Sequence, residues 1–97
     1  MIRHVVVFRW RPEATDEQKQ RVATELAALP PLMTGLVSFH CGADQGLVAG
    51  NADFVVTADF ESADAYLAYR HHPEHVAVLE RAINPIVEQR TSVQFEL

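Results

Sequence analysis

The chain is poor in cysteine and has no long apolar segment. Cys41 is the only cysteine among 97 residues, so no disulfide can form within the chain, and a reducing cytoplasm suits such a sequence. The apolar run at residues 5–8 is too short for the core of a signal peptide, and no segment approaches the ~18 apolar residues of a membrane helix. We therefore expect a cytoplasmic protein with no membrane association.

Basic residues are also scarce. Eight Lys and Arg stand against thirteen Asp and Glu, which gives a formal charge of -5. Proteins that bind nucleic acids or anionic membrane surfaces use an excess of Lys and Arg, so neither partner is expected. The length predicts a single domain over residues 1–97. A domain this small leaves much of its surface in water, which favours further burial through oligomerisation.

The first segment, residues 2–10, is rich in β-branched and aromatic residues and predicts a strand. Side chains alternate between the two faces of a strand. One face carries Ile2, His4, Val6, Phe8 and Trp10, and the other carries Arg3, Val5, Val7 and Arg9. Both faces hold large apolar side chains, which is typical of a sheet that is covered on both sides.

The rest of the chain predicts two helical regions and three further strands. A capping box at Thr15–Gln18 starts a helix that ends at Pro30. The second helical region begins near Ser62, restarts at Pro73 and is disturbed at Pro85. Strands are predicted at residues 36–41, 54–60 and 91–97.

The order β-α-β-β-α-β predicts an α+β, ferredoxin-like domain with a four-stranded antiparallel sheet. Right-handed crossovers place both helical regions on one face of this sheet. The other face carries Val5, Val7 and Val55, and no element of the chain is left to cover it. We therefore expect a second copy of the chain on this face, which would form a homodimer shaped as an α+β barrel.

The most informative part of the sequence for function is the histidine-rich stretch HHPEH at residues 71–75. Three interpretations compete for it. In a structural interpretation, His72 caps the helix that Pro73 opens. In a second, His72, Glu74 and His75 bind a metal ion, although zinc normally takes three or four converging ligands and this spacing is a weak signal.

The third interpretation is an acid–base site. An imidazole can take a proton near neutral pH, and the phenol of Tyr69, just before the histidines, can polarise a carbonyl oxygen. His4 lies on the strand face that we expect the helices to cover. Histidine and tyrosine side chains that point from the helices toward His4 would form a mostly apolar pocket with a few polar groups, as small-molecule sites have.

Three segments of the chain resemble the stress-responsive A/B barrel (Dabb) family. They are IRHVVVFRW at 2–10, FES at 60–62 and AYRHHPEH at 68–75, the last with the tyrosine, two intervening residues and H-P-x-H of the family. The resemblance spans essentially the whole chain. It implies a ferredoxin-like fold, dimerisation through the sheet faces, and a pocket between sheet and helices in each subunit.

The resemblance also implies roles for particular residues. Olivetolic acid cyclase-like members of the family close a linear polyketide thioester by aldol condensation without a metal. Their catalytic tyrosine corresponds to Tyr69, their general-base histidine to His75, and their first-strand histidine to His4. A further pocket histidine is replaced by Phe54 here, which implies a more apolar pocket and a different substrate.

On this basis Tyr69 and His75 are the expected catalytic residues. The expected ligand contacts are His4, Val6, Phe8, Phe54 and His72. The expected ligand is a small, largely apolar, oxygenated molecule, processed if at all by proton abstraction or cyclisation of a ketide-like substrate, with neither a metal nor a cofactor. Two alternatives stay open: a non-catalytic, stress-associated ligand-binding module, and a monooxygenase or heme-binding α+β barrel.

Overall fold

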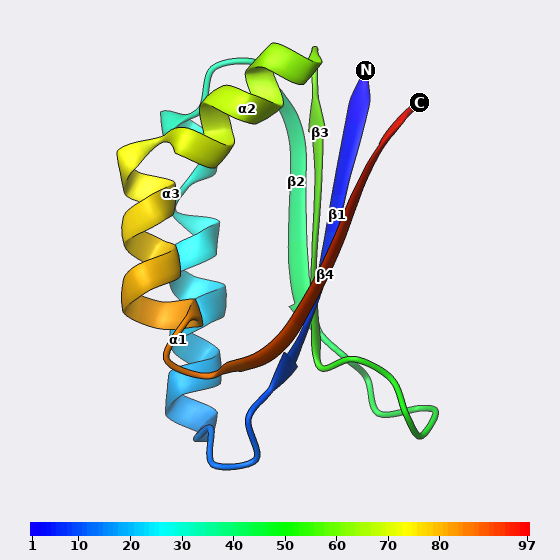
Figure 1. The fold of residues 1–97 in the computed structure, drawn as a ribbon, viewed down its shortest axis with the longest axis vertical. Helices are drawn as coiled ribbons and strands as arrows, with labels where there is room; N and C mark the ends of the chain where they lie inside the picture. The colour runs from blue at the N-terminus through cyan, green and yellow to red at the C-terminus, as the bar shows by residue number, and fades with distance from the viewer.

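The elements follow the predicted order β-α-β-β-α-β in a computed structural model that describes residues 1–97. The strands are β1 (Ile2–Trp10), β2 (Leu36–Ala43), β3 (Phe54–Phe60) and β4 (Val87–Glu96). The helical elements are α1 (Asp16–Ala27), a 3₁₀ turn η1 (Pro30–Leu32), α2 (Ala63–His71), α3 (Pro73–Val78) and a π-helical turn η2 (Leu79–Ile83). All helices lie on one side of the sheet (Figure 1). The ferredoxin-like prediction is confirmed.

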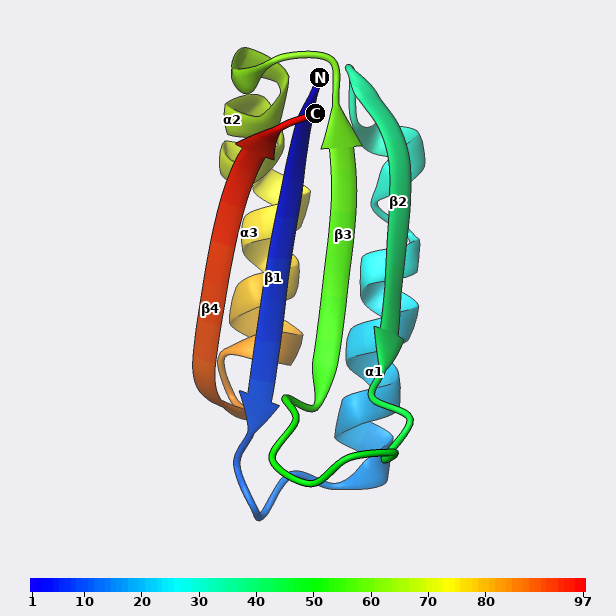
Figure 2. The same ribbon diagram turned by 90° about the vertical axis from the view of Figure 1, so that its right-hand side faces the viewer.

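The sheet has the strand order β2-β3-β1-β4, and every neighbouring pair is antiparallel (Figure 2). The division of β1 into two faces is also confirmed, since His4, Val6, Phe8 and Trp10 are buried beneath the helices. β1 lies between β3 and β4, and His4 pairs with Ala58 on one side and with Gln94 on the other. Its side chains therefore define the floor of the space between the two layers.

The helix α1 begins as the capping box predicts. Thr15 Oγ1 accepts from the Gln18 amide at 3.1 Å, and Gln18 Oε1 accepts from the Thr15 amide at 2.9 Å. Val22 and Leu26, one turn apart, are buried against the sheet. This stripe anchors α1 beneath the half of the sheet formed by β2 and β3 (Figure 2) and leaves the other half to α2 and α3.

The strand β4 starts at Val87, four residues before the predicted strand at 91–97. Its residues Arg90, Ser92 and Gln94 pair with Phe8, Val6 and His4 of β1, so they share the face that points toward the helices. All three are exposed, although they lie on the inner face. The layers are consequently open to water along β4. None of the helices has the length and apolarity of a membrane span.

The face of the sheet away from the helices carries a group of apolar side chains among polar ones. Val5, Val7 and Val55 are half-buried on it, and Val93 and Phe95 of β4 are 56% and 44% exposed. No element of the chain covers this face (Figure 1). Apolar side chains gathered on one open sheet face are typical of an interaction surface.

Close packing of α2 on the turn before β2 gives a testable prediction. Gly35 and Gly46 both have positive φ angles, 82° and 74°, which cost an L-residue about 1–2 kcal/mol. A β-carbon at Gly35 would lie 2.7 Å from Cβ of Ala65, whereas at Gly46 nothing lies within 4 Å. Gly35→Ala should therefore lose about 1–3 kcal/mol more unfolding free energy than Gly46→Ala. Urea denaturation measures both losses, and equal values would contradict this packing.

Candidate functional site

A cavity of about 390 Å³ lies between the sheet and the α2–α3 layer. This volume falls within the range of small-molecule sites, roughly 300–1,000 Å³. Its walls carry both apolar and polar side chains, and most of the polar ones come from α2, α3 and β4. The lining residues are His4, Val6, Phe8, Leu26, Val56, Tyr66, Tyr69, Arg70, His71, His75, Leu79, Ile83, Arg90 and Ser92.

Five of the seven residues proposed from the sequence line this cavity, namely His4, Val6, Phe8, Tyr69 and His75. The rings of Tyr69 and His75 are 4.3 Å apart between centroids, and those of His4 and Tyr69 are 6.3 Å apart. The structure thus brings together two side chains from the helical layer and one from the sheet.

Phe54 does not line the cavity. It pairs with Phe8 across β1 and β3 and is 4% exposed. Its ring lies 5.8 Å from that of Trp10 and 6.4 Å from that of Phe8, so it fills an aromatic cluster at the opposite end of β1 from His4. Its position four residues before Ala58, the partner of His4, accounts for this separation.

His72 does not line the cavity either. Its Nδ1 accepts from the Glu74 amide at 3.1 Å, so His72 caps α3, as the structural interpretation predicts. His71, to which the sequence analysis gave no role, lines the cavity instead. No group of three or more His, Cys, Asp and Glu side chains lies close enough to hold a metal ion.

The break between α2 and α3 orients His75. In a continuous helix the carbonyl of Arg70 would accept from the amide of Glu74, four residues on. That amide is bound to His72 instead, and the Arg70 carbonyl accepts from His75 Nδ1 at 3.1 Å. Because a carbonyl oxygen can only accept, Nδ1 carries the proton, and Nε2 of the neutral ring keeps its lone pair.

The surroundings of His75 keep it neutral. Burial lowers the pKa of His75, and this effect exceeds that of the bond to the Arg70 carbonyl, which favours the protonated ring. The positive charges of Arg70 and Arg90 lower the pKa further. At neutral pH the ring is therefore a base with Nε2 free.

His4 has the opposite hydrogen-bond polarity. Gln94 Nε2 lies 2.9 Å from His4 Nδ1, and an amide nitrogen can only donate, so Nδ1 accepts and Nε2 of the neutral ring carries the proton. Burial lowers the pKa of His4 to about 4, with contributions from the charges of His75 and Arg70. His4 is thus a neutral hydrogen-bond donor, and its 7% exposure places it on the cavity floor.

Tyr69 supplies a second donor. It is 3% exposed, and burial raises its pKa well above the ordinary value for a phenol, so the hydroxyl stays protonated at neutral pH. Every fully buried polar side-chain atom has a hydrogen-bond partner, and the Tyr69 hydroxyl has none in the protein, so it opens into the cavity. The ring centroid of Tyr66 lies 6.4 Å from that of Tyr69 and 4.9 Å from that of His4.

Sequence reasoning missed several residues that line the cavity or hold its side chains. Tyr66 lies three residues before Tyr69, on the same face of α2, and helical spacing could have identified it. Arg90 lies before the predicted start of its strand, and Gln94 becomes a neighbour of His4 only through the β1–β4 register. Side-chain partners 90 residues apart give no local sequence signal.

Comparisons with known proteins agree with this architecture. The family model of the Stress responsive A/B Barrel Domain matches residues 2–97, while a comparison with curated proteins finds no match. A dimeric ferredoxin-like protein of unknown function from Thermobifida fusca YX is 44% identical, with a TM-score of 0.92 over 99% of this chain and 90% of that one.

Two more distant solved structures show the same fold. The hydroxynitrile lyase from Passiflora edulis is 16% identical, with a TM-score of 0.85 over 99% of this chain and 92% of its own. SnoaB, a cofactor-independent oxygenase from Streptomyces nogalater, is 14% identical, with a TM-score of 0.78 over 99% and 91%. At these identities the likeness concerns the fold alone.

The neutral state of His4 gives a pH prediction. The folded-state pKa is about 4, below roughly 6.5 in an unfolded chain. The unfolded chain therefore binds more protons between these values, and stability falls as pH drops through that window. From pH 7 to pH 5 this contribution amounts to roughly 2 kcal/mol.

Between pH 7 and pH 5 the native chain should lose roughly 2 kcal/mol more unfolding free energy than the variant His4→Gln does. Urea denaturation at both pH values measures the difference. Leu67→Gln is the control, because Leu67 is exposed on α2, and it should keep the native pH dependence. The same pH dependence in His4→Gln and the native chain would contradict the buried, neutral His4.

Proposed function

The chain belongs to the stress-responsive A/B barrel domain family, and we propose that it binds a small, largely apolar carbonyl compound and removes a proton next to that carbonyl, without a cofactor. The observation that carries this proposal is the pairing of a neutral His75 with Tyr69 in one cavity. His75 has its Nε2 free to act as a base. Tyr69 offers a protonated hydroxyl, and its ring centroid lies 4.3 Å from that of His75. Proton abstraction requires both functions.

In this proposal His75 Nε2 takes the proton from the carbon next to the carbonyl. The electron pair moves onto the carbonyl oxygen, which becomes an enolate oxygen. Tyr69 and the Nε2–H of His4 donate hydrogen bonds to that oxygen. Positioned neutral donors of this kind stabilise negative charge as it develops on the oxygen. They offset the modest basicity of a buried imidazole.

The apolar walls favour the body of such a ligand. Val6, Phe8 and Val56 from the sheet face Leu79 and Ile83 from η2 across the cavity. An acyl chain or an aromatic ring would bury its surface there. SnoaB, described as a cofactor-independent oxygenase, and the hydroxynitrile lyase carry other chemistry on the same fold. The likeness to these two structures supports the scaffold and no further point.

We also propose that the chain forms a homodimer through the open face of the sheet. The relative from Thermobifida fusca is described as dimeric and is 44% identical over nearly the whole chain. The apolar side chains of this face, including Val5, Val7 and Val93, have no cover within the chain. A two-fold axis would place the same surface of a second copy on them.

The catalytic proposal predicts proton exchange at a methyl ketone. The native protein should accelerate deuterium uptake by the acetyl methyl group of 4-acetylbenzamide in D₂O, measured by proton NMR. His75→Ala should lower the catalysed rate by about 10²–10⁴-fold, the usual contribution of a general base. Tyr69→Phe should lower it by about 10²–10³-fold, as for loss of one oxyanion donor. Leu67→Gln, outside the cavity, should keep the native rate.

Binding is measured on the same samples by isothermal titration calorimetry. Binding of the ketone without exchange above background would reject catalysis at this ketone and favour a non-catalytic binding module. A native rate in His75→Ala would reject His75 as the base. Circular dichroism checks that each variant is folded, so that loss of exchange is assigned to chemistry.

The dimer proposal predicts a change of mass. The native chain should sediment at twice its 10.9 kDa. Val7→Lys, which places an unpaired charge in the centre of the open face, should weaken association by at least about 10²-fold, because a buried charge without a partner costs about 3–5 kcal/mol. Leu67→Lys, on the exposed side of α2, should remain dimeric. A dimeric Val7→Lys would place the interface elsewhere.

A further inference from the structure

The charge of the cavity differs in sign from that of the protein. The chain carries a formal charge of -5, yet no Asp or Glu lines the cavity, whereas Arg70 and Arg90 do. The imidazoles of His4, His71 and His75 share the same walls. An acidic protein that concentrates guanidinium groups around one opening produces a local positive potential, which attracts anions.

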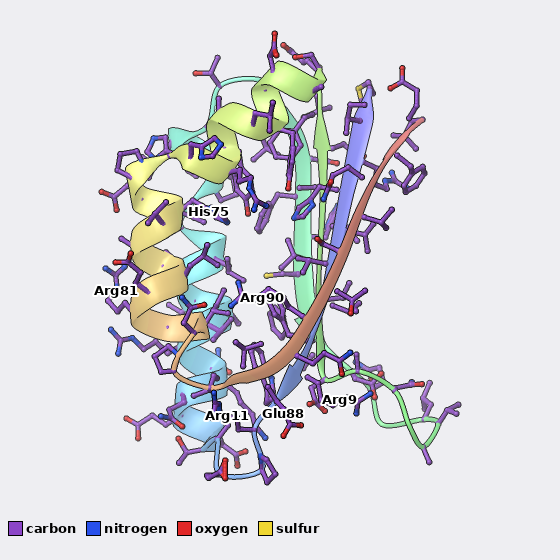
Figure 3. The ribbon with its side chains drawn as sticks, viewed as in Figure 1. Arg9, Arg11, His75, Arg81, Glu88 and Arg90 are labelled. Carbon is purple, nitrogen blue, oxygen red and sulfur yellow. The ribbon has the colours of Figure 1, made fainter.

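The two arginines come from opposite layers of the fold. Arg70 lies in the last turn of α2, and Arg90 lies on β4 beside Phe8. Figure 3 shows Arg90 extending from β4 into the space toward the helical layer, where His75 is also found. Both residues are exposed, so they lie where the cavity meets water. Both are also close enough to His75 for their charges to lower its pKa.

Neither arginine has an acidic partner. The salt bridges of the structure join Arg3 to Asp59 and both Arg21 and Arg81 to Glu25. Arg70 donates only to the hydroxyl of Tyr66, at 3.5 Å, and Arg90 donates to Asn84 Oδ1. A guanidinium has five N–H donors. Most donors of both groups are therefore free for a ligand.

We infer that the ligand carries a carboxylate, which Arg70 and Arg90 hold at the mouth of the cavity while the carbonyl end reaches Tyr69 and His75. This inference rests on the proposed function and narrows its substrate class to keto acids with an aromatic or acyl body. Arginine binds a carboxylate through two parallel hydrogen bonds, which fixes the orientation of the ligand as well as its affinity.

A bound carboxylate would also act on the base. The charges of Arg70 and Arg90 repel a proton on His75. A carboxylate between the two guanidinium groups neutralises that repulsion, which raises the pKa of His75 toward its ordinary value. Binding of the acid thereby makes His75 a stronger base in the complex than in the free protein.

Two probes of nearly equal shape test the inference. The anion 4-acetylbenzoate and the neutral 4-acetylbenzamide differ in charge at one end and share the acetyl group at the other. Isothermal titration calorimetry at low salt should show that the native protein binds the acid at least about tenfold more tightly than the amide. Arg70→Gln and Arg90→Gln should each reduce this preference to about threefold or less.

Arg11→Gln is the matched control. Arg11 is exposed, bonds to the backbone carbonyl of Val87 and lies outside the cavity, so its removal changes the net charge by the same amount. It should keep the native preference. Equal loss in Arg11→Gln would overturn the inference, because the effect would then come from overall charge.

The remaining outcomes separate this inference from the proposed function. Equal affinity of the native protein for acid and amide, or a preference that persists in both arginine variants, would overturn the carboxylate site and leave the proposed chemistry standing. Binding of neither compound, together with no exchange of the ketone, would overturn both.

Discussion

The site depends on the break between α2 and α3. Pro73 has no amide N–H to donate, and His72 takes the amide of Glu74, so the carbonyl of Arg70 is left for the ring of His75. An uninterrupted helix would close that carbonyl with its own backbone and leave His75 without a fixed tautomer. The cap and the proline therefore decide which nitrogen of His75 is free, although neither residue lines the cavity.

The strand faces could be predicted because alternation is a local property of the sequence. β1 separates its two sets of side chains as its pattern predicts. The start of β4 could not be predicted, because the residues after Val87 are polar and show no apolar alternation. They form a strand because β1 supplies a hydrogen-bonding edge through Trp10, independent of their side chains. The π-helical turn η2 likewise has no signal in its residue types.

The site was predictable in part for a similar reason. Tyr69 and His75 are close in sequence and match a family motif, and His4 follows from the strand pattern. Arg90, by contrast, reaches the cavity through a tertiary register that the sequence does not encode locally. Which nitrogen of His4 carries the proton is harder still to predict, because it depends on the identity of the hydrogen-bond partner, Gln94. The position of the proton on a histidine ring can therefore be assigned only once the fold shows which group bonds to it.

The two faces of the sheet connect the proposed dimer to the proposed chemistry. β4 is an edge strand, paired only with β1, and an unpaired edge is held less firmly than a central strand. Along it, Val93 points to the open face while Ser92 and Gln94 point to the face beneath the helices. A second copy packed on the open face would fix β4 from outside. It would thereby hold Gln94 against His4 and Arg90 at the cavity mouth, although no interface side chain touches the ligand.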